Sequence, residues 1–143
     1  MTEFLTKAAI LAADDIVTEQ VHVPQWGGTV LVRGMTGDER NAYEKQLLYE
    51  RPAGNRSARR AGQTTTEVRR EEIRNRLIMW CCVDQDGNRI FSEDDLSKIN
   101  TKSAAAIERV IEVAMRLSGL DDDDIEDMAE RMAKDPFVSE STP

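Results

Sequence analysis

The sequence predicts a small α+β domain that is predominantly α-helical and carries an N-terminal β-hairpin. Apolar residues recur at helical spacing in 107–117 and again in 125–132, which indicates two amphipathic helices. Two β-branched runs flank a Gly-Gly pair near the N-terminus, which indicates one hairpin. The chain has 143 residues, enough for one domain with its own core. We expect that domain to span residues 1–135 and residues 136–143 to form a disordered tail.

Composition excludes several classes of protein. Hydrophobic residues make up 40% and charged residues 32% of the chain, a balance that does not fit wholesale disorder. The longest uncharged apolar run, 77–83, is far shorter than the roughly 20 residues of a membrane span. We expect no secretory signal at the start of the chain. The net charge of −8 disfavours binding to membrane surfaces and to nucleic acid.

The first elements are predicted by residues 6–33. A run of good helix formers, including four alanines, predicts a short helix over 6–15. The hairpin follows within 21–33, where the β-branched runs meet at the Gly-Gly turn. Because Pro24 cannot donate a ladder hydrogen bond, we expect its strand to end there or to lie at a sheet edge.

A capped helix and a basic loop come next. Thr36 and Glu39 have the spacing of a capping box and predict a helix over 36–50, with Tyr43 and Leu47 on one face. Residues 51–65 contain one proline, two glycines and four arginines and no large aliphatic residue. This composition predicts a flexible Arg-rich loop.

The second half of the chain is predicted to be helical. A helix over 66–82 carries apolar residues on both faces near its end, so we expect it to be central to the core. Ser92, with Asp95 three residues later, predicts a short capped helix. The clearest helix spans 101–117 and stops before Gly119. A last helix begins near Asp121.

Catalytic chemistry has little support in the sequence. His22 is the only histidine, so one chain cannot hold a two-histidine metal site, and its place in an expected edge strand favours a solvated or packing role over catalysis. No glycine-rich phosphate-binding motif occurs. Cys81 and Cys82 are adjacent in an apolar run, so we expect buried packing rather than redox chemistry. We therefore expect a non-enzymatic protein without a cofactor.

The sharpest metal hypothesis is a calcium-binding EF-hand-like loop. With Gly87 as the sixth loop residue, Asp84 and Asp86 fall at positions three and five and Glu93 at position twelve. Cys82 would then occupy the first position, where a hard cation needs a carboxylate. An Asp-Gly turn that leads into a capped helix is therefore the favoured interpretation.

Two charged segments and one aromatic residue are candidate partner-binding sites. The acids of 121–124 are favoured as a helix cap and first turn, with a calcium site or an acidic docking patch as the alternatives. The Arg-rich loop is favoured as a solvated loop; its binding alternatives are an acidic partner, an RNA or the acidic body of a second copy. Trp26, beside the Gly-Gly turn, is equally consistent with a buried residue and an exposed anchor. The candidates are Trp26, Arg56, Arg59, Arg60, Asp121, Asp122, Asp123 and Asp124.

Three segments in order carry a resemblance to a known family. They are Ile10-Leu11-Ala12-Ala13-Asp14-Asp15, Val23-Pro24-Gln25-Trp26-Gly27-Gly28-Thr29-Val30-Leu31-Val32-Arg33 and Met35-Thr36-Gly37-Asp38-Glu39-Arg40. The later segment 83–95 and Lys102-Ser103 also fit the pattern. In this order the chain resembles the tail assembly chaperones of long-tailed bacteriophages, over about residues 5–120.

The resemblance implies a non-catalytic role in tail morphogenesis. Such chaperones bind the long tape-measure protein in the cytoplasm of the infected host, help to recruit tail tube subunits, and are thought to be absent from the finished virion. A holdase of this kind needs apolar grooves between helices. Charge contrast within the chain suggests self-association into an oligomer, in which the Arg-rich loop of one copy meets the acids 121–124 of the next. The alternatives are the calcium-binding regulatory protein and an Arg-loop RNA-binding adaptor, which lacks interleaved aromatics.

Overall fold

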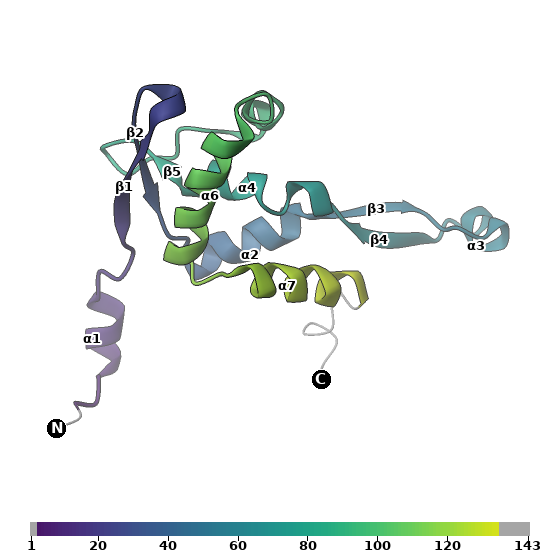
Figure 1. Cartoon of the computed structure of the whole chain (residues 1–143). Coiled ribbons are helices and arrows are strands. Elements are labelled where there is room, and N and C mark those ends of the chain that lie inside the picture. Colours follow the sequence, from purple (N-terminus) through teal and green to yellow (C-terminus); the bar gives the residue numbers. More distant parts are fainter. Residues whose placement is uncertain (1–2, 135–143) are drawn as a thin grey trace.

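A computed structural model describes residues 3–134, in which helices and small antiparallel sheets alternate along the chain. The predicted α+β class with mainly helical content is confirmed within this range. The predicted tail, 136–143, lies outside the described residues. Figure 1 shows a central body with two projections, the N-terminal helix on one side and a long two-stranded arm on the other.

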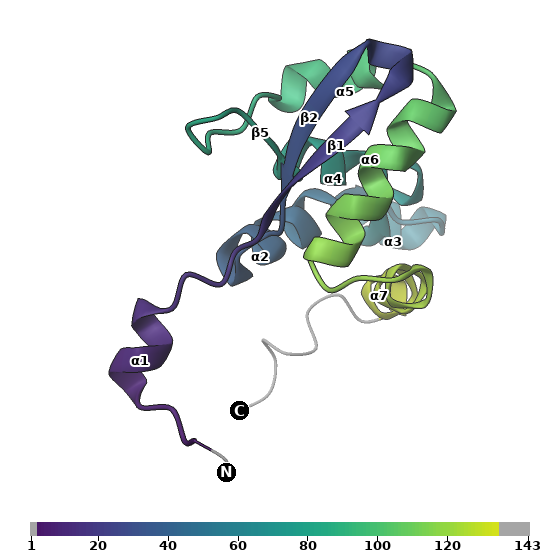
Figure 2. The same ribbon diagram turned by 60° about the vertical axis from the view of Figure 1, so that its left-hand side comes forward.

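The N-terminal helix α1 (Lys7–Ala12) lies apart from the body (Figure 2). The Thr6 side chain caps it by accepting a hydrogen bond from the Ala9 amide at 3.1 Å. Every described residue before Ile16 is exposed. The helix is therefore shorter than the predicted 6–15 and makes no contribution to the core.

The first sheet has the strand order β1-β2-β5. Strands β1 (Thr18–Val23) and β2 (Gly28–Arg33) pair antiparallel across the short 3-10 turn η1 (Pro24–Trp26). Gly27 closes this turn at φ 70°, a left-handed conformation that favours glycine. The two-residue strand β5 (Cys82–Val83) pairs with the other side of β2, so Pro24 ends an edge strand.

Helix α2 (Gly37–Gln46) begins at the predicted capping box. The Thr36 hydroxyl accepts from the Glu39 amide at 3.2 Å, and the Glu39 carboxylate accepts from the Thr36 amide at 2.9 Å. The Glu39 carboxylate also receives two hydrogen bonds from the Arg33 guanidinium at the end of β2. Tyr43 and Leu47, on the predicted inner face, are fully buried.

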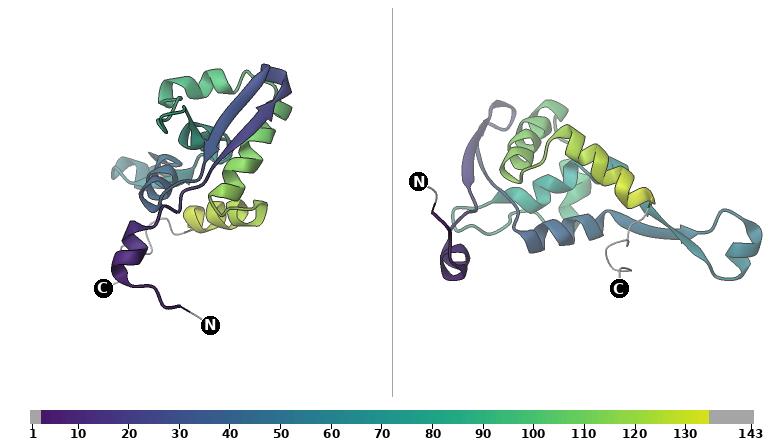
Figure 3. Two further views of the ribbon diagram at one scale, coloured as in Figure 1. Left: turned by 90° about the vertical axis from the view of Figure 1, so that its left-hand side faces the viewer. Right: turned by 90° about the horizontal axis from the view of Figure 1, so that it is seen from below.

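The prediction of a flexible loop over 51–65 is wrong, because most of these residues belong to strands or a helix. Strands β3 (Leu48–Pro52) and β4 (Thr64–Val68) pair antiparallel, and helix α3 (Arg56–Arg60) closes their far end. Figure 3 shows this arm extending well beyond the body. The threonines of 64–66 favour a strand, and pairing with β3 completes it. Local composition alone gives no signal for that pairing.

The helix predicted over 66–82 is also wrong in its first half. Strand β4 continues to Val68 and the 3-10 turn η2 (Arg70–Glu72) follows, so helix α4 spans only Asn75–Cys81. Its buried residues form an unbroken run from Arg76 to Cys81. The predicted central position in the core is therefore correct.

After an Asp-Gly turn, the 3-10 turn η3 (Glu93–Asp95) and helix α5 (Leu96–Ile99) follow, and Ser92 and Asp95 form the predicted capping box. Helices α6 (Ala104–Leu117) and α7 (Asp122–Lys134) complete the described chain. Gly119, at φ 72°, turns the chain between them. No helix within residues 3–134 combines the length and apolar character needed to cross a membrane.

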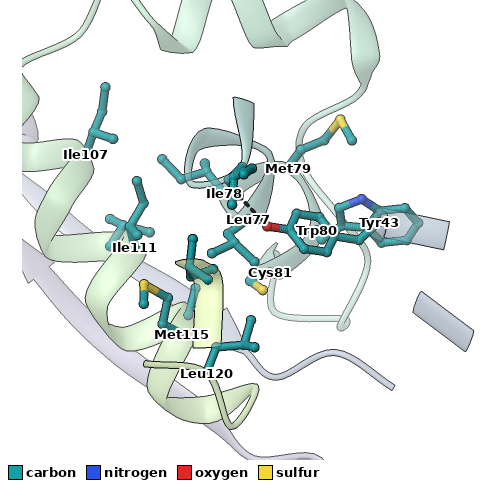
Figure 4. Close-up of a cluster of buried hydrophobic side chains, with 14 of the residues drawn as sticks. Tyr43, Leu77, Ile78, Met79, Trp80, Cys81, Ile107, Ile111, Met115 and Leu120 are labelled. Carbon is teal, nitrogen blue, oxygen red and sulfur yellow. Dashed lines mark hydrogen bonds between the residues drawn. The ribbon is translucent and has the colours of Figure 1, made fainter. Parts of the chain in front are cut away.

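The core forms where α4 packs between α2 and α6. In Figure 4, Leu77 and Cys81 of α4 lie between Tyr43 of α2 and the apolar stripe of α6, whereas Met79 and Trp80 lie on the side of α4 away from that stripe. Tyr43 donates a hydrogen bond from its hydroxyl group to the backbone carbonyl of Ile73 within this cluster. Buried Leu120 and Ile125 extend the core to the start of α7, as expected of a hydrophobic staple around a capped helix start.

Candidate functional site

An apolar pocket opens beside the turn between β1 and β2. Its volume is about 440 Å³, within the usual range for a ligand site. The lining combines η1, α4 and the segment from β5 to the start of α6. The residues are Trp26, Ile78, Phe91, Asp95, Lys98, Ile99 and Lys102. We call this the Trp26 pocket.

Trp26 forms part of the rim of this pocket. Its side chain is 36% exposed, which places it between the two alternatives left open by the sequence. The turn geometry of Pro24 and Gly27 holds the indole at the end of the hairpin. Buried Ile78 and Ile99 form the apolar lining, while Lys98 and Lys102 are exposed around it. The site therefore combines an apolar lining with two exposed lysines and one acid, Asp95, whose carboxylate accepts hydrogen bonds from Ser92.

The arginine candidates lie together at the tip of the arm. Arg56, Arg59 and Arg60 all belong to α3 and are exposed. Arg59 donates a hydrogen bond from Nε to the Ala53 carbonyl at 3.1 Å. This bond orients the side chain, although the residue remains exposed to solvent. No aromatic residue lies in α3, so the tip lacks the stacking platform of a single-strand RNA site.

The acidic candidates form the start of α7, and part of their role is structural. Asp121 and Asp124 accept each other's backbone amide hydrogen bonds, at 2.7 and 3.0 Å. Asp122 pairs with Arg74 at 2.9 Å, although its side chain is 85% exposed. Asp123 is exposed. The favoured capping role is thus present, and carboxylates still face solvent.

The structure does not bring the two charged segments together within one chain. Figure 1 shows α3 at the tip of the arm. Helix α7 runs toward the arm, so its first residues lie at the end of α7 that is farther from the arm. Helix α7 instead packs beside β4 at the root of the arm. A contact between the arginine tip and the acids of 121–124 would therefore join two copies.

The calcium candidates have other partners. Asp84 accepts the backbone amides of Asp86 and Asn88 through one oxygen, at 2.9 and 3.0 Å, and so closes the Asp-Gly turn. Glu93 binds the guanidinium of Arg76. Within residues 3–134, no three His, Cys, Asp or Glu residues are grouped as metal ligands. The geometry gives the EF-hand alternative no support.

The remaining side chains that could carry chemistry are two cysteines and one histidine. Cys81 and Cys82 are fully buried. Burial raises the pKa of the Cys81 thiol to about 11 and that of the Cys82 thiol to about 12, so neither is a ready nucleophile at neutral pH. His22 is exposed on strand β1. These positions agree with the packing and solvated roles that the sequence favoured.

Most residues of the Trp26 pocket come together only in the folded chain. Phe91 and Lys102 belong to segments that fit the family pattern, but nothing in their spacing places them or Lys98 in one pocket with Trp26. Sequence spacing gives no signal for such long-range proximity. Only the isolated Trp beside a Gly-Gly turn pointed to this region.

Comparison with known proteins adds one finding. A family model described as phage tail assembly chaperone matches residues 5–134. No curated protein and no solved structure matches the chain significantly. The matched range includes the Trp26 pocket, the arm and every helix of the described residues.

Proposed function

The chain belongs to the phage tail assembly chaperone family, and we propose that it binds the tape-measure protein and helps to recruit tail tube subunits. Family membership implies a binding role rather than catalysis. The proposed site of action is the cytoplasm of the infected bacterial host, before the tail tube polymerises. By the same proposal the protein leaves before the virion is complete.

The Trp26 pocket is the observation that supports client binding best. A tape-measure protein, as the family resemblance implies, is a long helix-prone chain with apolar repeats. An apolar helix binds by inserting a few side chains into a groove of matching character. The Trp26 pocket offers such a lining, and the half-exposed indole provides a rigid aromatic edge. Lys98 and Lys102 would favour clients with acidic residues next to the apolar ones.

Self-association is a second part of the proposal, carried by a different observation. Three exposed arginines lie at the arm tip, and several exposed carboxylates lie at the start of α7. Opposite charges at two separate places on the molecule, the arm tip and the start of α7, fit a head-to-tail contact that repeats from copy to copy. Several copies could then coat one long client.

This contact has a charge-swap test. Arg60→Glu should weaken association at low salt, and Arg60→Glu combined with Asp123→Lys should restore it. Lys45→Glu, which changes an exposed charge on α2 outside the two segments, provides the matched control. A wild-type protein that stays monomeric at low salt and high concentration would contradict the contact.

Client binding has a separate test in co-production. The tape-measure protein of the same phage is produced with and without this chain, and its soluble fraction is measured. We expect it to be soluble and to co-elute with this chain only when both are present. Trp26→Ser should reduce co-elution, whereas Ile90→Ser, which removes another exposed apolar side chain away from the Trp26 pocket, should not. Equal solubility with and without the chain would contradict the proposal.

A further inference from the structure

The N-terminal segment, residues 3–15, is an exposed apolar surface that the body of the protein does not cover. Phe4 is 92% exposed and Leu11 is 75% exposed. From Phe4 to Ala13, Lys7 is the only charged residue. Soluble proteins rarely leave several large apolar side chains together in solvent, and where they do the surface commonly marks an interaction site.

The helix within this segment also lacks tertiary support. Helix α1 has six residues and no buried side chain. Isolated helices shorter than about 12 residues are marginal in water, and most helix stability in proteins comes from packing of an apolar face. Burial of Leu5, Ile10 and Leu11 against another surface would supply the packing that α1 lacks.

The Trp26 pocket is complementary to this segment in polarity and charge. Its lining is apolar apart from Asp95, whose carboxylate already accepts hydrogen bonds from Ser92, and Lys98 and Lys102 stand exposed at its rim. The N-terminal segment carries the acids Glu3, Asp14 and Asp15 on either side of its apolar stretch. Apolar side chains in the pocket and acids against its lysines would satisfy both surfaces at once.

We propose that the N-terminal segment of one copy docks in the Trp26 pocket of a second copy. Figure 2 shows α1 and the turn η1 at opposite ends of β1, with α1 directed away from the body. The six residues of β1 alone span about 20 Å between them, and residues 13–17 lie between α1 and the strand. The segment would have to double back along the strand to reach its own pocket, so its orientation favours exchange between copies.

This docking does not depend on the proposed chaperone function, because both surfaces belong to the same chain. It is also distinct from the contact between the arm tip and α7, which rests on exposed charges alone. An apolar client helix would compete with the segment for the same pocket. Self-association through this contact would then decrease as client is added.

A mixing experiment with the full chain tests the exchange. A segment variant, Phe4→Ser/Leu11→Ser, keeps its pocket, and a pocket variant, Trp26→Ser/Lys98→Glu, keeps its segment. Sedimentation velocity is measured in about 0.5 M salt, where a Debye length of roughly 4 Å suppresses contacts between exposed charges. We expect wild type to associate with rising concentration, each variant to stay monomeric, and their equimolar mixture to form a heterodimer.

Far-UV circular dichroism and thermal melting of both variants establish that they are folded. Ile90→Ser is the control for loss of an exposed apolar side chain outside the pocket and should associate as wild type does. Association of the segment variant by itself would overturn the proposal. So would a monomeric wild type, or a mixture without heterodimer. A change in Trp26 emission that depends on the segment but not on concentration would assign the pocket to the segment of the same chain.

Discussion

Glu93 binds the buried guanidinium of Arg76 through both carboxylate oxygens, at 2.7 Å from Nη1 and 2.6 Å from Nη2. Arg76 is only 4% exposed on α4. Its Nε donates to Glu72 at 2.7 Å, and Gln46 accepts from both Arg76 and the Trp80 indole. The ion pair between Arg76 and Glu93 joins helix α4 to the 3-10 turn η3, which also supplies Asp95 to the lining of the Trp26 pocket.

Loss of this pair should destabilise the fold. Glu93→Gln removes the charge that faces a buried guanidinium, and a charged hydrogen bond of this kind contributes about 1–3 kcal/mol to the free energy of unfolding. Asp94→Asn changes the neighbouring exposed acid on the same turn and should cost less than about 0.5 kcal/mol. Urea denaturation of both variants measures the difference. Equal losses would show that only the general charge of the turn matters.

Acid should weaken the same interactions in a predictable pH range. The hydrogen bond from Arg76 lowers the pKa of Glu93. Burial opposes ionisation of Glu39, but its hydrogen bonds from Arg33 and from the Thr36 amide outweigh it and lower its pKa as well. A lowered pKa in the folded state means that the stabilisation is complete above the ordinary value of 4.5 and is lost as pH falls through the folded-state pKa.

The measurement compares wild type with Glu39→Gln by denaturation at a series of pH values. The gap in unfolding free energy should be constant near neutral pH and should narrow below pH 4.5. A gap that is independent of pH down to the acid limit would show that the Glu39 charge does not stabilise the fold.

Gly34 should tolerate no side chain. A Cβ at this position would overlap the backbone carbonyl oxygen of Leu117 at the end of α6. Gly34→Ala should therefore force β2 and α6 apart at a cost of about 1–3 kcal/mol. Gly37→Ala, where a Cβ meets nothing within 4 Å, is the control and should be neutral or slightly stabilising. Equal melting temperatures for the two variants would contradict the close approach.

The cysteines should be protected from thiol reagents in the folded protein. Both side chains are buried and their pKa values are raised to about 11 and 12, so little thiolate exists at pH 8. Labelling of Cys81 and Cys82 should be slow in buffer and fast in denaturant. Rapid stoichiometric labelling without denaturant would show that α4 opens to solvent.

Local chemistry accounts for the parts of the fold that the sequence predicted. The capping boxes at Thr36 and Ser92 and the stripe of α6 depend on residues three or four apart, and all three lie where expected. The strands of the arm could not be predicted in this way, because each is recognisable only when it is paired with the other. The run of threonines in β4 becomes a strand by bonding to β3, about fifteen residues earlier.

The candidate site was predictable to the extent that it is local. The caps at Asp121 and Asp124 follow from the order of acids before an apolar run. Trp26 was singled out by its turn, but its exposure depends on Phe91 and α5, which no spacing connects to it. The buried Arg76 was likewise unexpected, because its partners come from three separate elements.

The most direct test of the central claim is a pull-down from cells that produce the phage encoding this chain. The tagged protein is captured during tail assembly, and its partners are identified by mass spectrometry, with Trp26→Ser and Ile90→Ser captured in parallel. Wild type and Ile90→Ser should recover a very long tape-measure protein, with or without tube subunits, and Trp26→Ser should recover much less. Recovery of host proteins or RNA alone by the wild-type chain would contradict the proposed function.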